Sequence, residues 1–164
     1  MDRPSAEMAR ILFLCLGNIC RSPTAEAVLR HMADAAGLDL TVDSCGTGNW
    51  HAGEPPDRRA IAAAAQRGYD LTALRARQLA AEDFSRFDLI LAMDRSNLRG
   101  AEERRPARAT AELLLFGSLL DAERPGAKSM DVPDPWYSGD FDGALDLIED
   151  GCRALIRRLS QPAQ

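Results

Sequence analysis

The sequence predicts an α/β fold in which a parallel β-sheet is covered by helices on both faces. Short apolar runs alternate along the chain with segments of helical periodicity, which is the pattern of strands joined by crossover helices. With 164 residues, 46% of them hydrophobic, the chain can bury a core without help from disulfides or metals. No apolar run approaches the ~20 residues that a membrane-spanning helix needs.

Four apolar runs are the candidates for buried strands. They are ILFLCL, LTVDSC, FDLILAM and AELLLF, at residues 11–16, 40–45, 87–93 and 111–116. Their length and apolar character fit strands that are buried on both faces of a sheet.

Helical periodicity follows the first two of these strands and closes the chain. Apolar residues recur at helical spacing over residues 25–36. Residues 55–68 indicate a helix with proline near its first turn and Gly68 just beyond its end. A last helix is expected at 142–159, where Cys152 lies on the apolar stripe and is therefore predicted to be a core residue.

The chain shows no linker, repeat or low-complexity segment, so we expect a single domain over residues 1–164 with flexible tails at 1–8 and 160–164. The net charge of −5 argues against a nucleic-acid partner. The start of the chain contains acidic residues, and the apolar run after it is too short for a signal peptide. We therefore expect a cytoplasmic protein with no membrane partner.

The cysteines are few and widely spaced. Cys15, Cys20, Cys45 and Cys152 contain no C-x-x-C pair, and the chain has only two histidines. This spacing argues against a structural zinc site, and no metal or cofactor is expected. Reduced thiols in a cytosolic compartment fit the pattern better than a disulfide framework.

The stretch CLGNICRSP combines residue types that suit an anion site. The first strand is expected to end at Cys15, and the next helix to begin at Ser22 and Pro23, with serine as N-cap. The residues between them form a strand-to-helix loop at the carboxyl end of a strand, where ligands bind in open α/β sheets. Gly17 and Asn18 are the residue types best able to adopt the positive φ that a tight backbone cradle demands.

Cys15 and Arg21 give this cradle its predicted chemistry. The helix dipole and Arg21 favour thiolate over thiol at Cys15, so a bound oxyanion would lie above a nucleophile. Arg21 can bind two phosphate oxygens bidentately and stabilise a phosphoryl transition state. Taken singly, a cysteine at a strand end is commonly inert and an arginine near a helix start is usually at the surface. Cys20 either packs or forms a disulfide that protects Cys15 from over-oxidation.

The sequence CLGNICRSPTAE resembles the active-site loop of the low-molecular-weight protein tyrosine phosphatases, of the bacterial type. The likeness continues through DSCGTGNWHAGEPPDRRA, RARQLAAEDFSRFDLILAMDRSNL and DVPDPWYSGDFDGALDLIEDGC, and covers the chain from Arg10 to about Leu159. The resemblance implies a three-layer, flavodoxin-like sandwich around a four-stranded parallel sheet. It also implies a two-step mechanism without metal, through a cysteinyl-phosphate intermediate.

The resemblance also assigns roles to residues of this chain. It makes Cys15 the nucleophile, Arg21 the phosphate clamp and Asp134 the general acid. Ser22 would donate a hydrogen bond to the thiolate, and Asn18 would organise the loop. The expected substrate-binding residues are those of the loop and of an aromatic cleft: Leu16, Gly17, Asn18, Ile19, Cys20, Ser22, Trp50, Trp136 and Tyr137.

Asp134 has support from the residues themselves. Residues 117–140 are rich in Pro, Gly and Asp and are longer than ordinary connections, so a functional or disordered loop is expected there. The leaving group of a phosphotyrosine needs a proton, and Pro133 and Pro135 would hold a carboxylic acid in place. Alternatively, Asp131 and Asp134 are ordinary turn formers beside proline. The Asp-Pro-aromatic match favours Asp134 as the acid.

Flat side chains would form the walls of the cleft. Trp50, Trp136 and Tyr137 can stack on a phenyl ring and make the cleft too deep for the shorter phosphoserine. Trp50 could instead be half-buried packing. Where many relatives carry histidine before the R-A-R-Q-like segment, this chain has Leu74, so Ser44 and Asn18 are expected to rely on each other or on water.

We weigh three functions. The leading one is a phosphotyrosine-protein phosphatase, acting as a monomer or weak dimer on phosphotyrosine proteins, with a tyrosine kinase among the candidate partners. A thiol-dependent arsenate reductase would need further cysteines on a mobile segment, and none occurs between Cys45 and Cys152. A catalytically silent phosphate-binding module would have no need of Cys15, Arg21 and Asp134 together.

Overall fold

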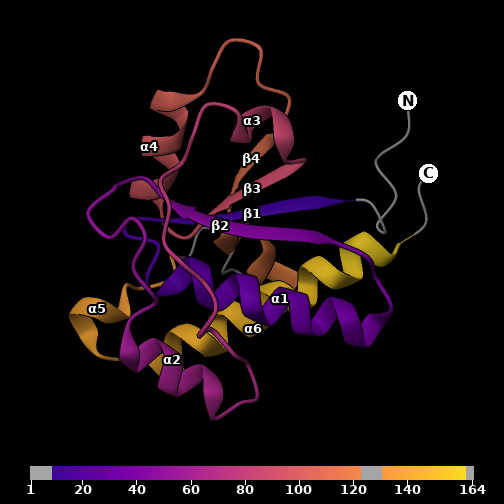
Figure 1. Ribbon diagram of the computed structural model, residues 1–164. Coiled ribbons are helices and arrows are strands. Elements are labelled where there is room, and N and C mark those ends of the chain that lie inside the picture. Colours follow the sequence, from indigo (N-terminus) through magenta and orange to yellow (C-terminus); the bar gives the residue numbers. More distant parts are fainter. Residues whose placement is uncertain (1–8, 123–130, 162–164) are drawn as a thin grey trace.

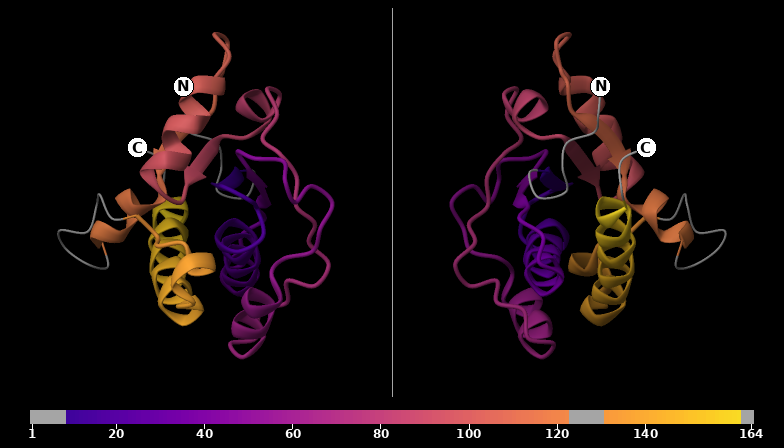
Figure 2. Two further views of the ribbon diagram at one scale, coloured as in Figure 1. Left: turned by 90° about the vertical axis from the view of Figure 1, so that its left-hand side faces the viewer. Right: turned by 90° about the vertical axis from the view of Figure 1, so that its right-hand side faces the viewer.

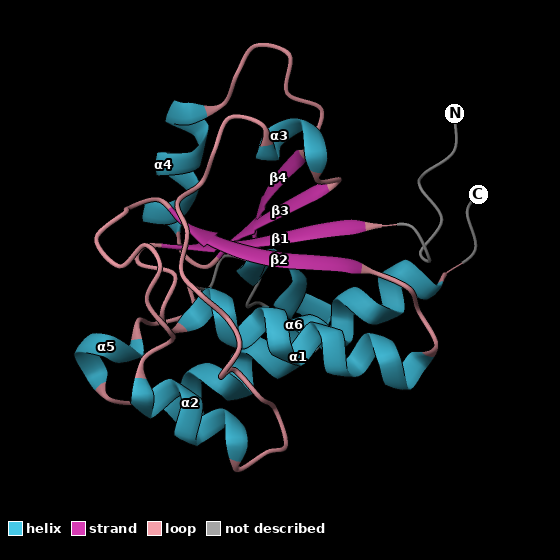
Figure 3. Ribbon diagram, in the orientation of Figure 1, coloured by secondary structure: helices cyan, strands magenta, loops and turns pink. Residues whose placement is uncertain are grey.

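The computed structural model describes residues 9–122 and 131–161, and it shows a sheet of four strands between two layers of helices (Figure 1, Figure 3). In chain order the elements are β1 (Arg10–Cys15), α1 (Arg21–Ala36), β2 (Thr41–Gly46), α2 (Arg58–Ala65), α3 (Asp83–Arg86), β3 (Leu89–Ala92), α4 (Arg95–Arg104), β4 (Glu112–Leu115), the 3₁₀ helix η2 (Phe116–Ala122), α5 (Pro135–Ser138) and α6 (Phe141–Ser160). The expected tail at 1–8 and residues 162–164 of the expected tail at 160–164 lie outside the described residues, and Ser160 is the last residue of α6.

The sheet has the strand order β2-β1-β3-β4, and every neighbouring pair is parallel. Successive side chains of β1 point to opposite faces of the sheet. Phe13 packs toward α1 and α6, which lie side by side on one face (Figure 2), and Leu14 packs with Phe84 and Ala101 on the other. The predicted α/β sandwich is therefore confirmed. No helix in the described part of the chain is long and apolar enough to cross a membrane.

The order of the strands decides where a site can form. β2 lies on one side of β1 and β3 lies on the other, so the direction in which strands are added reverses at β1. In open α/β sheets such a reversal leaves a crevice beside the carboxyl ends of the two strands, here β1 and β3. The start of α1 and the N-cap of α4 meet there, where Arg21 binds Asp94. The segment that begins at Asp131 joins them, because the amide of Val132 donates to the carbonyl of Met93.

Two local predictions about the loop after β1 were wrong. Ser22 is not the N-cap of α1: the helix begins at Arg21 after Cys20, and the Ser22 hydroxyl lies against Cys15 Sγ and the Cys45 carbonyl. The hydroxyl of Ser22 is therefore engaged in tertiary contacts and does not cap the helix. Gly17 does not adopt a positive φ, whereas Asn18 does, at 57°.

The helices otherwise lie near their predicted ranges. The helix expected at 55–68 is α2, which is capped by the side chain of Asp57 and preceded by the two prolines. Cys152 is fully buried on α6, as predicted. The segment 117–140 is not one loop, because η2 and α5 lie within it, and residues 123–130 lie outside the described residues.

Gly46, the last residue of β2, lies directly under the loop that follows β1. A Cβ atom at this position would lie 2.6 Å from the carbonyl oxygen of Leu16 and 3.1 Å from the amide nitrogen of Asn18. Both are main-chain atoms, so neither can rotate away. The close approach of the two segments therefore requires glycine.

We expect Gly46→Ala to lower the free energy of unfolding by about 1–3 kcal/mol, because the added methyl group must displace the loop backbone. Urea unfolding measures this change. Thr41→Ser, at the exposed start of the same strand, is the control and should stay within about 0.5 kcal/mol of the wild type. Identical unfolding midpoints for Gly46→Ala and the wild type would mean that the loop yields without cost.

Candidate active site

A cavity of about 340 Å³ opens where β1 ends and α1 begins, and it gathers most of the predicted site residues. Its lining residues are Cys15, Leu16, Gly17, Ile19, Cys20, Arg21, Trp50, His51, Asp134, Trp136 and Tyr137. Asn18 and Ser22 lie outside this lining because both are buried behind the loop. His51 also lines the cavity, although no motif in the sequence singled it out.

Cys15 is positioned by the sheet as the last residue of β1, with 3% of its surface exposed. Two groups approach its sulfur. The amide N–H of Asn18 donates to Sγ at 3.3 Å, and Ser22 Oγ lies 3.0 Å from Sγ. A backbone amide, a hydroxyl and the N-terminal end of a helix thus converge on this sulfur.

Arg21 lies in the first turn of α1 with its guanidinium buried among acceptors. Nη1 donates to Asp94 Oδ2 at 2.7 Å and to the carbonyl of Val132 at 2.9 Å, and Nη2 donates to Asp134 at 3.5 Å. Burial alone would lower the pKa of Arg21, but the negative charges of Cys15, Asp94 and Asp134 outweigh burial and raise it. The guanidinium is therefore a fixed cation at the cavity.

Asp94 was missed in the sequence, although a signal for it exists. It is the N-cap of α4, where Oδ1 accepts from the amide of Asn97 while Oδ2 holds Arg21. An acidic residue directly after a buried strand lies at the same edge of a parallel sheet as the loop after β1. The stretch LAMD at the end of β3 could have indicated it.

Asp134 and Asp131 have different surroundings. Asp134 is the N-cap of α5: Oδ1 accepts from the amide of Trp136 at 3.0 Å, and Oδ2 faces Arg21. Asp131 instead accepts from the amide and the guanidinium of Arg95, at the start of α4, and is absent from the cavity lining. Of the two carboxylates, the one at Asp134 can reach a group bound above Cys15.

The rim of the cavity is apolar and exposed. The large hydrophobic side chains that are exposed in the described residues all line it: Leu16 at 39%, Trp136 at 48%, Trp50 at 67% and Tyr137 at 79%. Exposed apolar side chains that gather at one place usually mark a binding surface. His51 lies among them, with its ring centroid 6.4 Å from that of Trp136 and Nδ1 3.0 Å from Glu54 Oε1.

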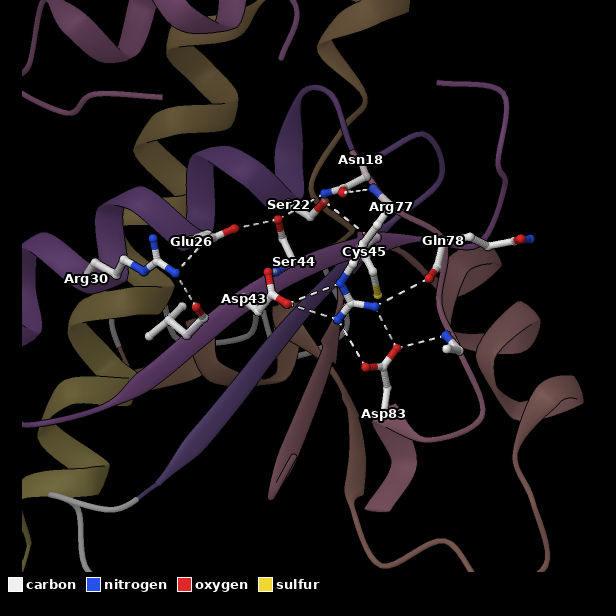
Figure 4. Close-up of polar contacts among 12 residues, drawn as sticks. Asn18, Ser22, Glu26, Arg30, Asp43, Ser44, Cys45, Arg77, Gln78 and Asp83 are labelled. Atoms are coloured by element: carbon white, nitrogen blue, oxygen red, sulfur yellow. Dashed lines mark hydrogen bonds and ion pairs between the residues drawn. The ribbon is translucent and has the colours of Figure 1, made fainter. Parts of the chain in front are cut away.

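A buried polar network supports the loop from behind (Figure 4). Asn18 Nδ2 donates to Ser22 Oγ at 2.8 Å and to Ser44 Oγ at 3.0 Å, so Asn18 and Ser44 do bond to each other. Ser44 in turn donates to Glu26 Oε1 at 2.7 Å, and Glu26 pairs with Arg30 at 2.8 Å.

Leu74, noted above as a departure from the family pattern, is a partly buried side chain that packs against the apolar core. Glu26 provides the polar end of the network. Burial raises the pKa of Glu26, although the hydrogen bond from Ser44 and the charge of Arg30 act in the opposite direction.

Three cysteines besides Cys15 are buried and free. Burial raises the pKa of Cys20, Cys45 and Cys152, so each is held as a thiol. Cys20 alone among them lines the cavity. Within residues 9–122 and 131–161, no three His, Cys, Asp or Glu side chains are grouped so that they could hold a metal ion.

Comparison with known proteins places the chain in one family. The sequence model of the low molecular weight phosphotyrosine protein phosphatases matches residues 10–164. The low molecular weight phosphotyrosine protein phosphatase of Schizosaccharomyces pombe is 46% identical over 133 residues, which are 79% of this chain and 82% of that protein.

Solved structures agree with this placement. The crystal structure of YfkJ from Bacillus subtilis, at 36% identity, matches 94% of this chain and 98% of its own with a TM-score of 0.83. An arginine phosphatase from Drosophila, at 33% identity, matches 92% of this chain and 98% of its own with a TM-score of 0.83. The chain thus belongs to the low molecular weight phosphotyrosine protein phosphatase family and is a protein-tyrosine phosphatase.

Proposed function

We propose that this enzyme hydrolyses phosphotyrosine in proteins through a cysteinyl-phosphate intermediate, without a metal ion. The observation that carries the proposal is that the thiol of Cys15, the guanidinium of Arg21 and the carboxyl of Asp134 line one cavity under an aromatic rim. These are a nucleophile, a phosphate clamp and a proton donor. Each part of the reaction then has a group in place for it.

In the first step, the Cys15 thiolate attacks phosphorus, and an S–P bond forms as the bond from phosphorus to the tyrosyl oxygen breaks. The amides of the loop and the Arg21 fork hold the phosphate oxygens where negative charge gathers. Asp134, protonated at this stage, gives its proton to the leaving phenolate. Because Arg21 supplies the positive charge and Cys15 the nucleophile, the step needs no metal.

In the second step, water attacks the phosphocysteine and the S–P bond breaks. Asp134, now a carboxylate, takes the proton from this water. The electron pair of the S–P bond returns to Cys15 as a thiolate. The Ser22 hydroxyl, 3.0 Å from the sulfur, can donate to that thiolate and so improve it as a leaving group.

The rim supports an aromatic substrate. Trp50, Trp136 and Tyr137 stand on the walls of the cavity while Cys15 is almost fully buried, so a phosphate must arrive on a long, flat side chain to reach the sulfur. Phosphotyrosine proteins, tyrosine kinases among them, fit this shape. A reducing compartment such as the cytoplasm fits the four free thiols. We propose a monomer or weak dimer as the working form.

The enzyme should hydrolyse phosphotyrosyl peptides and para-nitrophenyl phosphate in the presence of EDTA, and Cys15→Ser should abolish turnover. Because the cradle is built from backbone and Arg21, the variant should still bind inorganic phosphate, which calorimetry measures. Phosphoseryl and phosphoarginyl peptides are the comparison substrates, the second because the Drosophila relative is an arginine phosphatase. Near-normal activity in Cys15→Ser, or preference for either comparison substrate, would contradict the proposal.

Asp134→Asn should slow hydrolysis of phosphotyrosine by about 10²- to 10⁴-fold, and that of an activated aryl phosphate by less, because a good leaving group needs little protonation. Steady-state rates over a series of aryl phosphates measure the difference. Asp131→Asn is the matched control and should show no such dependence, since Asp131 binds Arg95 and not the cavity. A leaving-group dependence that appeared in Asp131→Asn instead would mean that the acid is misassigned.

Mild peroxide should inactivate the enzyme reversibly. The Cys15 thiolate is oxidised to a sulfenic acid as peroxide is reduced, and the Cys20 thiol then displaces water to form a disulfide, which dithiothreitol reduces. Because burial keeps Cys20 a thiol, peroxide should attack Cys15 first.

Peptide mapping of the oxidised enzyme identifies the linkage. Cys20→Ser should turn the reversible loss of activity into an irreversible one, whereas Cys152→Ala should recover like the wild type. A Cys15–Cys45 disulfide, or a sulfinic acid as the main product in the wild type, would contradict this assignment.

A further inference from the structure

The side-chain amide of Asn18 is held at both ends. Its Nδ2 donates to Ser22 and Ser44, while its Oδ1 accepts from the backbone amide of Arg77 at 2.9 Å. The backbone amide of Asn18 donates to Cys15 Sγ. A rotation of Asn18 would therefore move the amide that faces the reactive sulfur, and the amide of Arg77 is one of the groups that prevent it.

The segment that carries Arg77 has little regular structure to fix it. It runs between α2 and α3, and its backbone pairs with the sheet at an isolated parallel bridge between Gly46 and Gln78. Gly46 donates to the carbonyl of Arg77 at 2.9 Å, and Leu79 donates to the carbonyl of Gly46 at 2.8 Å. The neighbouring Ala76 also exchanges backbone hydrogen bonds with Gly53 and Glu54, at 2.8 and 2.9 Å, and the side chain of Arg77 adds a further anchor to these backbone bonds.

The guanidinium of Arg77 is that anchor (Figure 4). Nη1 and Nη2 donate to the two carboxylate oxygens of Asp83 at 2.9 and 3.0 Å, and Nε and Nη2 donate to Asp43 Oδ2 at 3.2 and 3.1 Å. Asp43 belongs to β2 and Asp83 begins α3, so the side chain joins the segment to two elements. The planar fork of arginine suits this bidentate geometry, which an ammonium group cannot reproduce.

Asp83 makes the arrangement hard to rearrange. Its side chain is 1% exposed, and besides Arg77 it accepts a hydrogen bond from the amide of Ala80 at 2.8 Å. A buried carboxylate without its cation is strongly unfavourable, so the guanidinium of Arg77 must stay paired with Asp83. Neither residue lines the cavity, so neither touches the substrate.

We propose that Arg77 is a positioning residue for the phosphate loop: its guanidinium, held between Asp43 and Asp83, fixes the amide that orients Asn18 and hence the donors around Cys15. The proposal deepens the proposed function and rests on it for its effect on turnover. The proposal also predicts weaker binding of inorganic phosphate by the loop when Arg77 is changed, and phosphate binding can be measured without turnover.

The test compares Arg77→Lys with Arg75→Lys. Arg75 is exposed in the same segment, and its guanidinium donates to the carbonyls of Thr72 and Leu74. Arg77→Lys should lower kcat on para-nitrophenyl phosphate by up to about 10²-fold, the cost of a small misplacement at a reacting centre. It should also weaken the protection that inorganic phosphate gives Cys15 against iodoacetate. Arg75→Lys should match the wild type in both assays.

A double variant separates positioning from general loss of stability. If Arg77 acts through Asn18, then Asn18→Ala combined with Arg77→Lys should be no slower than Asn18→Ala alone. Independent, multiplying losses would overturn the proposal. So would Arg77→Lys with wild-type kcat and wild-type phosphate protection.

Two further results keep the outcome clear. If Arg77→Lys does not fold, Asp43→Asn removes the negative charge from the partly exposed half of the clamp and should weaken phosphate protection in the same direction, to a smaller extent. Unchanged protection in Asp43→Asn would then overturn the proposal. If the wild type fails to hydrolyse phosphate esters, the proposed function fails, yet the alkylation assay still decides whether Arg77 positions the loop.

Discussion

The left-handed backbone of Asn18 is the constraint on which the rest of the site depends. At a φ of 57°, its amide N–H points to Cys15 Sγ while its side chain turns back into the protein. A non-glycine residue in this region carries strain and persists only where its surroundings hold it. Here Ser44 of β2, Ser22 of α1 and the amide of Arg77 supply those surroundings. Three separate parts of the chain therefore converge on one side chain to shape the loop.

The polar network behind the loop ends at Glu26, whose carboxylate accepts a hydrogen bond from Ser44. Because the folded chain raises the pKa of Glu26, folding favours its protonated form, and the stability that this gives is lost as the pH rises through the raised pKa. Once the pH lies above that raised pKa, the ionised Glu26 is thus no gain in stability by itself. We infer that Glu26 serves to orient the hydroxyl of Ser44. Arg30, which also donates to the Val42 carbonyl, reduces the free-energy cost of burying the Glu26 carboxylate.

The sequence allowed the local parts of the site to be predicted and concealed the distant ones. Cys15, Asn18 and Arg21 lie in one short motif between a strand and a helix, so loop chemistry and the family resemblance were enough to select them. Asp94 and Arg77 act on that motif from residues that are remote in sequence, and only the sheet order β2-β1-β3-β4 brings them near. Ser22 failed as a predicted N-cap because its hydroxyl lies against Cys15 Sγ and against the carbonyl of Cys45, which the fold brings in from β2.

The site therefore divides into a rigid floor and a free rim. The floor is buried, and each of its polar groups is tied to others, so a change at Ser44 or Arg77 spreads to Cys15. The rim, by contrast, presents exposed side chains such as Trp50 and Tyr137, which line the mouth of the cavity. Substitutions there can alter which phosphoproteins fit while the machinery beneath keeps its geometry. This arrangement of strands and loops thus combines a fixed floor, which carries out one reaction, with a rim that can vary to recognise different substrates.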